Sequence, residues 1–211
     1  MSTLKLKGST SGEAQVTVAS SAGTPTITLP TASINLATAG SDGQFLKTNG
    51  SGTLSFATAG LFSSYAIICD EKTTGSDGGT FTHGAWQHRD LNTEIMDPDG
   101  IVSISSNQFT LGAGTYYFEW AAPGYRCNGH KSRLYDVTGS AVVELGFQAM
   151  SDTGNDGDTS YSYGFARDTI TADNTYRIEH RSSSTKADQG FGRSFDIDTE
   201  RFTYVKIFKE A

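Results

Sequence analysis

The feature that most constrains the fold is a pair of alternating apolar runs at residues 107–120, NQFTLGAGTYYFEW. In the first run apolar residues alternate with polar ones. In the second, Tyr116, Phe118 and Trp120 place three large rings on one face of a strand. Residues 112–114, Gly-Ala-Gly, separate the two runs. This pattern predicts a tight β-hairpin whose strands enter a buried sheet.

The composition favours the same structural class. The 211 residues include 24 Gly but only 4 Pro, and Ser and Thr are abundant. No window of about a dozen residues keeps the apolar spacing of a helix, so we expect an all-β protein. Aromatic and charged residues become frequent near residue 61, where we place a boundary between residues 1–60 and residues 61–211.

Short apolar or alternating runs follow residue 61 at regular intervals, with turn residues between them. Residues 138–140, Thr-Gly-Ser, are expected to join two of these strands. Such a series suits two antiparallel sheets packed as a β-sandwich of the jelly-roll type. Outside residues 107–120, the expected strands cover residues 65–69, 101–104, 131–137, 141–148, 159–170, 175–181 and 202–208.

Residues 1–60 are too poor in large apolar side chains to bury a core alone. Their apolar residues form short period-two patches at residues 4–6, 16–18 and 27–29. One alternative is a disordered linker. The other is an extended β-rich shaft, in which three copies of the chain share these patches along a common axis. Asn49-Gly50 is in addition a strong local signal for a hairpin.

Two copies of ATAG, at residues 37–40 and 57–60, enclose the segment SDGQFLKTNGSGTLSF. This segment resembles a repeat of tail fibres and related virion proteins of bacteriophages. In that repeat a Gly-Gln-aliphatic strand, an Asn-Gly turn and a second short strand precede a head domain. The resemblance implies that residues 1–60 attach the protein to another virion protein.

Residues 79–94 read GTFTHGAWQHRDLNTE, and residues 116–118 read Tyr-Tyr-Phe. Both segments resemble the C1q/TNF-like family of jelly rolls, the first of them in the form found in phage proteins. The resemblance implies a C1q/TNF-like jelly-roll head over residues 61–211. It also implies a homotrimer with the last strand beside the threefold axis, and a role in binding, because few members of the family are enzymes.

The charge and hydropathy pattern excludes several classes of partner. A formal net charge of -7 argues against nucleic acid, because phosphate binding needs a basic face. No apolar run approaches the length of a membrane span, and we expect no signal peptide and no membrane insertion. Cys69 and Cys127 either pair or remain buried free thiols, and an intracellular protein favours free thiols.

The search for catalytic motifs finds no nucleophile elbow, P-loop, dinucleotide fingerprint or HExxH. The four histidines lie in separate strands and loops, and no pair has metal-ligand spacing with a carboxylate or thiolate, so we expect His83, His88, His130 and His180 to be structural or exposed. Paired carboxylates of a glycosidase depend on the fold and cannot be read from the sequence. We therefore expect no enzyme, and a polysaccharide depolymerase stays as the less favoured alternative.

One loop has the oxygen ligands that calcium prefers. In SDTGNDGD, Asp152, Asn155, Asp156 and Asp158 lie within a few residues of one another. The loop departs from the EF-hand pattern, so a solvated hairpin tip is the default interpretation. Calcium is a weak alternative, and no other cofactor is expected.

Four residues near loops are candidates for ligand binding. Tyr125, Tyr161 and Tyr163 offer rings on which sugars can stack, and Arg126 can bond to hydroxyl groups. The alternative for each ring is packing within the sandwich or across a trimer interface.

These observations favour a trimeric bacteriophage tail fibre that recognises the host surface, with polysaccharide as the expected ligand. A capsid decoration or cement protein, or a head-fibre trimer, is the alternative. The expected partners are two further copies of the chain, another virion protein bound through residues 1–60, and a host glycan. The expected location is the virion, assembled in the host cytoplasm.

Overall fold

The computed structural model describes residues 3–7, 13–17, 44–48, 54–58, 60–154 and 158–211. These ranges contain strands and loops, and among them there is no helix long and apolar enough to cross a lipid bilayer. The chain divides into two compact units, Met1–Ala57 and Thr58–Ala211. We call the second unit the head.

The first unit contains short paired strands. Strand β1 (Thr3–Lys7) pairs antiparallel with β2 (Glu13–Thr17), and Leu4 lies opposite Val16. Strand β3 (Gln44–Thr48) pairs with β4 (Leu54–Thr58). These two strands flank the expected Asn49-Gly50 turn. The turn itself and the patch at residues 27–29 lie outside the described residues. A shaft made of three copies stays a prediction.

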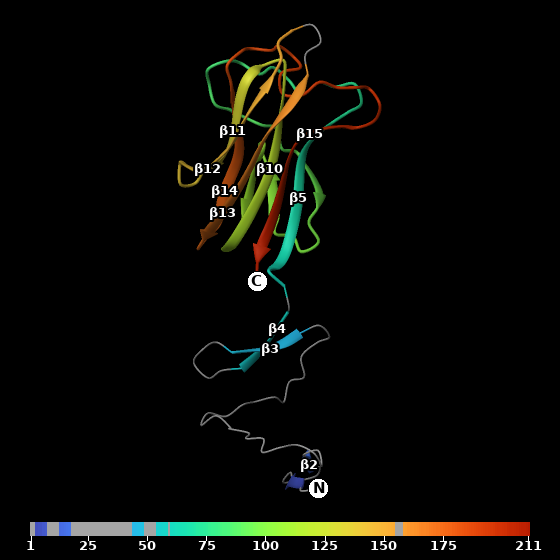
Figure 1. Cartoon of the computed structure of the whole chain (residues 1–211), viewed down its shortest axis with the longest axis vertical. Helices are drawn as coiled ribbons and strands as arrows, with labels where there is room; N and C mark the ends of the chain where they lie inside the picture. The colour runs from blue at the N-terminus through green and yellow to red at the C-terminus, as the bar shows by residue number, and fades with distance from the viewer. Residues whose placement is uncertain (1–2, 8–12, 18–43, 49–53, 59, 155–157) are drawn as a thin grey trace. The chain divides into compact units, whose positions relative to one another are not determined.

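The head is a sandwich of two antiparallel sheets (Figure 1). One is five-stranded, in the order β13-β10-β15-β5-β7. The other is six-stranded, in the order β12-β11-β14-β9-β8, with β6 paired to β14. The strands are β5 (Phe62–Lys72), β6 (Gln87–His88), β7 (Thr93–Met96), β8 (Val102–Ser105), β9 (Gln108–Leu111), β10 (Gly114–Tyr125), β11 (Asn128–Asp136), β12 (Ala141–Ser151), β13 (Thr159–Ile170), β14 (Asn174–Ser182) and β15 (Glu200–Glu210).

From β9 onward the chain crosses between the sheets after nearly every strand. Only β11 and β12 follow each other within one sheet, joined by the expected turn at residues 138–140. This repeated crossing is the connectivity of a jelly roll. The predicted all-β jelly-roll class is therefore confirmed.

The predicted hairpin at residues 107–120 is wrong. Strand β9 pairs with β8 and β14, whereas β10 pairs with β13 and β15 in the opposite sheet. The Gly-Ala-Gly segment is a crossover that takes the chain from one sheet to the other. Alternation reports which face of a strand is buried and not which strand is its neighbour, so both arrangements give the same sequence pattern.

The segment at residues 79–94 contains little regular strand. Only the two-residue β6 and the start of β7 are strands there. Phe81 and Leu91 are nevertheless buried, and Trp86 is half-buried. The segment is a loop that places apolar residues into the head at intervals.

The core consists of rings from both sheets. Phe118 of β10 is fully buried. Its ring centroid lies 6.3 Å from that of Phe109 on β9 and 5.4 Å from that of Tyr176 on β14. Burial of such a ring contributes about 2 to 3 kcal/mol relative to exposure. The expected inward orientation of Tyr116, Phe118 and Trp120 is confirmed.

Trp120 fills the space next to a glycine on the neighbouring strand. Its indole Nε1 donates a hydrogen bond to Ser132 Oγ at 2.9 Å, which fixes the ring between the sheets. Gly164 lies opposite Trp120 in the register of β10 and β13. A Cβ at this glycine would lie 1.9 Å from Trp120 Cζ2, so only glycine leaves room for the indole.

We expect Gly164→Ala to lower the free energy of unfolding by about 1 to 3 kcal/mol, because the added methyl overlaps the fixed indole. Urea denaturation followed by tryptophan fluorescence measures this change. Gly112→Ala is the matched control, since its nearest neighbour would be Asp173 Oδ1 at 3.7 Å. Equal destabilisation by the two substitutions would contradict this account of the core.

Candidate assembly surface

Strand β13 presents large rings to solvent. Tyr161, Tyr163 and Phe165 are 40%, 47% and 46% exposed. The intervening residues Ser162 and Gly164 are buried. This is the pleat of a strand whose inner face packs with small residues while its outer face is aromatic.

Neighbouring strands continue this outer face, because directly paired residues point to the same side of a sheet. Tyr163 pairs with Ala121 on β10, and Ala121 pairs with Tyr204 on β15. Tyr204 in turn pairs with Cys69 on β5. A row of aromatic and small apolar residues therefore crosses the outer face of four strands.

The next row across the sheet has apolar residues at its two ends and one ion pair between them. Phe165 pairs with Glu119, Glu119 with Lys206, and Lys206 with Ile67. Lys206 Nζ lies 3.3 Å from Glu119 Oε2, so the two charges compensate each other. Ile67 then pairs with Met96 at the end of β7.

A shallow hollow of about 410 Å³ opens on this side of the head, and Ile67, Ile95, Tyr161, Tyr163 and Tyr204 line it. Apolar surfaces of this kind usually mark interaction sites. We call the outward-facing set the aromatic face; its members are Ile67, Ile95, Met96, Tyr161, Tyr163, Phe165 and Tyr204.

The aromatic face continues around the open edge of the sandwich, where β12 lies beside β13. Phe147 on β12 is 64% exposed, and its ring meets that of Phe165 edge-on at a centroid distance of 6.2 Å. We call the exposed apolar residues of β12 the rim; they are Val142, Leu145, Phe147 and Met150.

The four predicted ligand residues do not form one exposed site. Tyr161 and Tyr163 stack with ring centroids 6.0 Å apart, within the aromatic face. Tyr125 is only 4% exposed, and its hydroxyl accepts a hydrogen bond from Arg193, so its ring is not an open platform as expected. Arg126 donates to the carbonyl of Thr153 across a loop. Ligand binding by Arg126, Tyr161 and Tyr163 stays a prediction.

The fully buried Arg89 connects several segments at the loop-bearing end of the head. Arg89 Nε donates to Thr203 Oγ1 at 2.6 Å, and its terminal nitrogens donate to the carbonyls of Pro123 and Phe191. The guanidinium also stacks on the Phe191 ring at 4.1 Å from its centroid. Burial lowers the pKa of Arg89 to about 10, a change that the charge of Asp70 opposes. Arg89 therefore remains charged at neutral pH.

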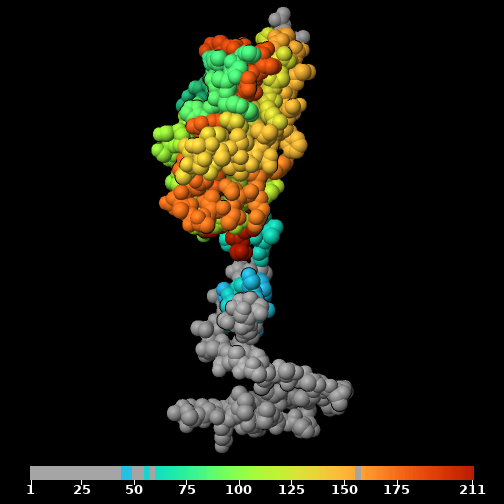
Figure 2. All heavy atoms as spheres, turned by 90° about the vertical axis from the view of Figure 1, so that its left-hand side faces the viewer, coloured from blue at the N-terminus to red at the C-terminus, as the bar shows by residue number. Residues whose placement is uncertain are grey.

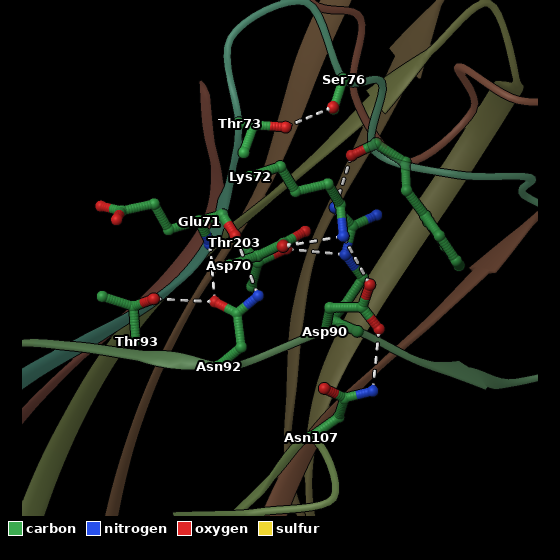
Figure 3. Close-up of polar contacts among 12 residues, drawn as sticks. Asp70, Glu71, Lys72, Thr73, Ser76, Asp90, Asn92, Thr93, Asn107 and Thr203 are labelled. Carbon is green, nitrogen blue, oxygen red and sulfur yellow. Dashed lines mark hydrogen bonds and ion pairs between the residues drawn. The ribbon is translucent and has the colours of Figure 1, made fainter. Parts of the chain in front are cut away.

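Charged and amide side chains fix the end of β5 to the segment after β6 (Figure 3). Lys72 Nζ lies 3.1 Å from Asp70 Oδ1 and 2.7 Å from Asp90 Oδ2. Asp90 Oδ1 accepts a hydrogen bond from Asn107. Asn92 both accepts from the backbone N–H and donates to the backbone carbonyl of Glu71, each at 2.9 Å. Residues 89–92, Arg-Asp-Leu-Asn, thus perform a structural task.

Two histidines form a buried pair that the sequence does not indicate. His130 Nδ1 and His180 Nε2 are 2.9 Å apart, and His130 Nε2 lies 2.7 Å from Ser160 Oγ. Burial lowers the pKa of His130 to about 4 and holds the pKa of His180 well below its usual value. Both are therefore neutral at pH 7, while His83 and His88 are exposed. The pair arises from the register of β11 and β14, which no spacing reveals.

The acidic loop at residues 152–158 uses its described carboxylates for backbone bonds. Asp158 Oδ1 accepts from the N–H of Asp152, and Asp152 Oδ1 accepts from the N–H of Gly154. Asn155 and Asp156 lie outside the described residues. Among the side chains that the structure describes, no three His, Cys, Asp or Glu residues gather as a metal site would require.

Both cysteines are free. Cys69 and Cys127 are buried without a disulfide, as the sequence favours. Burial raises the pKa of both thiols, that of Cys69 to about 11. The thiols are therefore protonated at neutral pH and act as small apolar residues.

We expect the head to lose stability as the pH falls from about 6.5 towards 4. The folded state keeps His130 and His180 neutral while the unfolded chain binds protons, so acidification favours unfolding, by about 2 kcal/mol at pH 5 from His130 alone and by a further amount from His180. Thermal melts between pH 7 and pH 5 measure this loss.

The double substitution His130→Asn/His180→Gln is expected to flatten this pH dependence, and His83→Asn/His88→Asn should leave it unchanged. Burial raises the pKa of Asp70, which works in the opposite direction and is common to all these variants. An unaltered slope after removal of the buried pair would contradict the assignment.

No protein-family model and no curated sequence matches the chain. Solved structures do resemble it. Murine APRIL is 8% identical, with a TM-score of 0.44 over 69% of this chain and 98% of its own. The globular domain of zebrafish complement 1qA is 18% identical, with a TM-score of 0.44 over 69% and 95%. The vertex protein P5 of PRD1 is 9% identical, with a TM-score of 0.43 over 72% and 100%. At these values the likeness says nothing about ligand, partner or assembly.

Proposed function

We propose that the protein is a structural component of a bacteriophage virion, a tail-fibre adhesin whose head assembles as a homotrimer through the aromatic face. The observation that supports this proposal most is the extent of exposed apolar surface, which runs from Ile95 on β7 to Phe147 on β12. Soluble monomers rarely expose a contiguous apolar patch of this kind without a partner.

The form of this surface favours a ring of copies. The aromatic face covers the outside of one sheet, and the rim lies on the edge strand of the other, so the two are different surfaces. Contact between the face of one copy and the rim of the next is heterologous, and such contacts form a ring when the rotation from copy to copy closes. The number three comes from the resemblance of residues 79–94 and 116–118 to C1q/TNF-like proteins.

The adhesive role follows from clustering. Three identical heads present the same weak site three times, and simultaneous engagement strengthens binding by a factor on the order of 100 to 10,000. A host surface polysaccharide repeats the same sugar unit many times and therefore offers the three heads many equivalent binding sites. Residues 1–60 provide attachment to another virion protein in this proposal.

A capsid decoration protein or head fibre is the second candidate. The segment SDGQFLKTNGSGTLSF fits it equally well, because it resembles a repeat of tail fibres and of related virion proteins. The two candidates differ in the virion protein that residues 1–60 contact.

We expect light scattering on the purified protein to give a mass near three times 22.5 kDa. Tyr163→Arg places a charge opposite Ala121 in the aromatic face, where it lacks a carboxylate partner across the strands, and should shift the mass to that of one chain, with an unchanged far-UV circular dichroism spectrum. Ile197→Arg is the control, since Ile197 is 87% exposed on a loop outside the face. A parent protein that is monomeric at micromolar concentration would refute the assembly.

Gold-labelled antibodies against the head should mark the tail of the virus particle in electron micrographs. Label spread over the capsid shell would instead support the decoration protein. Particles without label at either place would refute both candidates.

A further inference from the structure

Two hollows on the outer face of the six-stranded sheet meet at Trp86. One, of about 590 Å³, is lined by residues that include Asp90 and Glu179. The other, of about 710 Å³, is lined by residues that include Lys131 and Arg181. Both volumes lie in the range of ligand pockets. In Figure 2 the green atoms of the loop before β7 lie beside the yellow atoms of β11 and β12 on this side of the head. We call the two hollows together the Trp86 groove.

The Trp86 ring is held in place without being enclosed. The Arg133 guanidinium lies 4.1 Å from the ring centroid, and Arg133 Nε donates to Glu179 Oε2 at 2.6 Å. The adjacent Gln87 belongs to β6, which pairs with β14, and its Oε1 accepts a hydrogen bond from the N–H of Thr82. The ring is half-buried and lines both hollows, so it forms a fixed aromatic wall.

The floor of the larger hollow has two uncompensated positive charges. Gln148, Lys131 and Arg181 are directly paired across β12, β11 and β14, so their side chains share one face. Within the described part of the chain, neither Lys131 nor Arg181 has an ion pair or a side-chain hydrogen bond. By contrast, Arg177 on the same face forms an ion pair with Glu179, to which it donates at 2.8 Å, and Arg133 shares that carboxylate. Two free cations side by side are notable in a chain of net charge -7.

We propose that the Trp86 groove binds an acidic saccharide, a chain that contains hexuronate units. The carboxylate of one unit pairs with Lys131 and Arg181, the apolar face of a sugar ring packs on Trp86, and the Gln148 amide bonds to hydroxyl groups. Aromatic stacking combined with a few fixed polar groups is how proteins bind sugars. This inference deepens the adhesin proposal and rests on it only for the ligand being a surface polysaccharide.

The charge distribution favours this ligand over the other polyanions. A nucleic acid has a charge on every nucleotide and needs a continuous basic face, which the acidic head does not provide around its two free cations. A neutral saccharide would leave Lys131 and Arg181 without partners in the complex. A saccharide that contains uronate units offers a carboxylate to the two cations and the apolar face of a sugar to the Trp86 ring.

The first experiment exposes the full-length protein to an array of uronate-containing oligosaccharides, neutral oligosaccharides and an oligothymidylate. We expect binding to be confined to uronate-containing chains and to weaken at least tenfold between about 0.05 M and about 0.5 M salt. Binding to neutral chains alone, equal binding to the oligothymidylate, or no uronate chain bound would overturn the proposal.

The second experiment uses variants with the strongest uronate ligand of the array. Lys131→Gln/Arg181→Gln should weaken binding by a factor on the order of 100, since two charged hydrogen bonds are lost. Lys47→Gln/Lys209→Gln removes the same charge elsewhere and should retain the parent affinity. Equal affinity of the two double variants would place the ligand outside the groove and overturn the proposal.

Tryptophan fluorescence reports the position of the ligand. The chain has only two tryptophans, and Trp120 is 1% exposed in the core, so a change on ligand binding comes from Trp86. Trp86→Phe should abolish the signal and retain binding measured by calorimetry, whereas Trp86→Ala should weaken binding at least tenfold. Failure of this inference leaves the mass of the oligomer and the labelling of the virus particle unchanged, so it is distinct from failure of the proposed function.

Discussion

The buried charge of Arg89 is the constraint on which the loop-bearing end of the head depends. Removing a guanidinium from water costs several kcal/mol unless its donors are satisfied. Here the compensation comes from Thr203 on β15, Pro123 on β10 and Phe191 in the loop before β15. One side chain therefore connects three segments that are distant in sequence. Because Arg89 follows Trp86 by three residues, these bonds also fix the position of the loop that contains Trp86.

Sequence alternation predicts the interior of the head well and its connections poorly. The burial of Phe118 and Trp120 follows from period-two spacing, because a strand places alternate side chains on opposite faces. The partner of a strand is not encoded in that period, so the crossover between β9 and β10 has the sequence of a hairpin. The His130–His180 pair and the Arg89 bonds are invisible for a related reason, since they join residues that only the sheet register brings together.

The candidate sites show the same limit. Tyr125 ends β10 and Tyr163 lies within β13, and Tyr163 is 47% exposed whereas Tyr125 is only 4% exposed. The difference comes from a loop: the N–H of Tyr125 donates to Gly190, and Arg193 reaches its hydroxyl. Composition identifies aromatic residues as candidates, but only the path of distant loops decides which remain accessible. The outer faces of the two sheets also differ. That of the five-stranded sheet is aromatic, whereas that of the six-stranded sheet has two free cations beside Trp86.

The place of β15 within its sheet determines when the head can form. This strand lies between β10 and β5, and it is made from residues 200–210, long after both neighbours. A nascent chain therefore holds β5 and β10 without the strand that joins them until residues 200–210 have left the ribosome. The five-stranded sheet can close only after every other strand of the head has been made, as expected for contacts of large sequence separation.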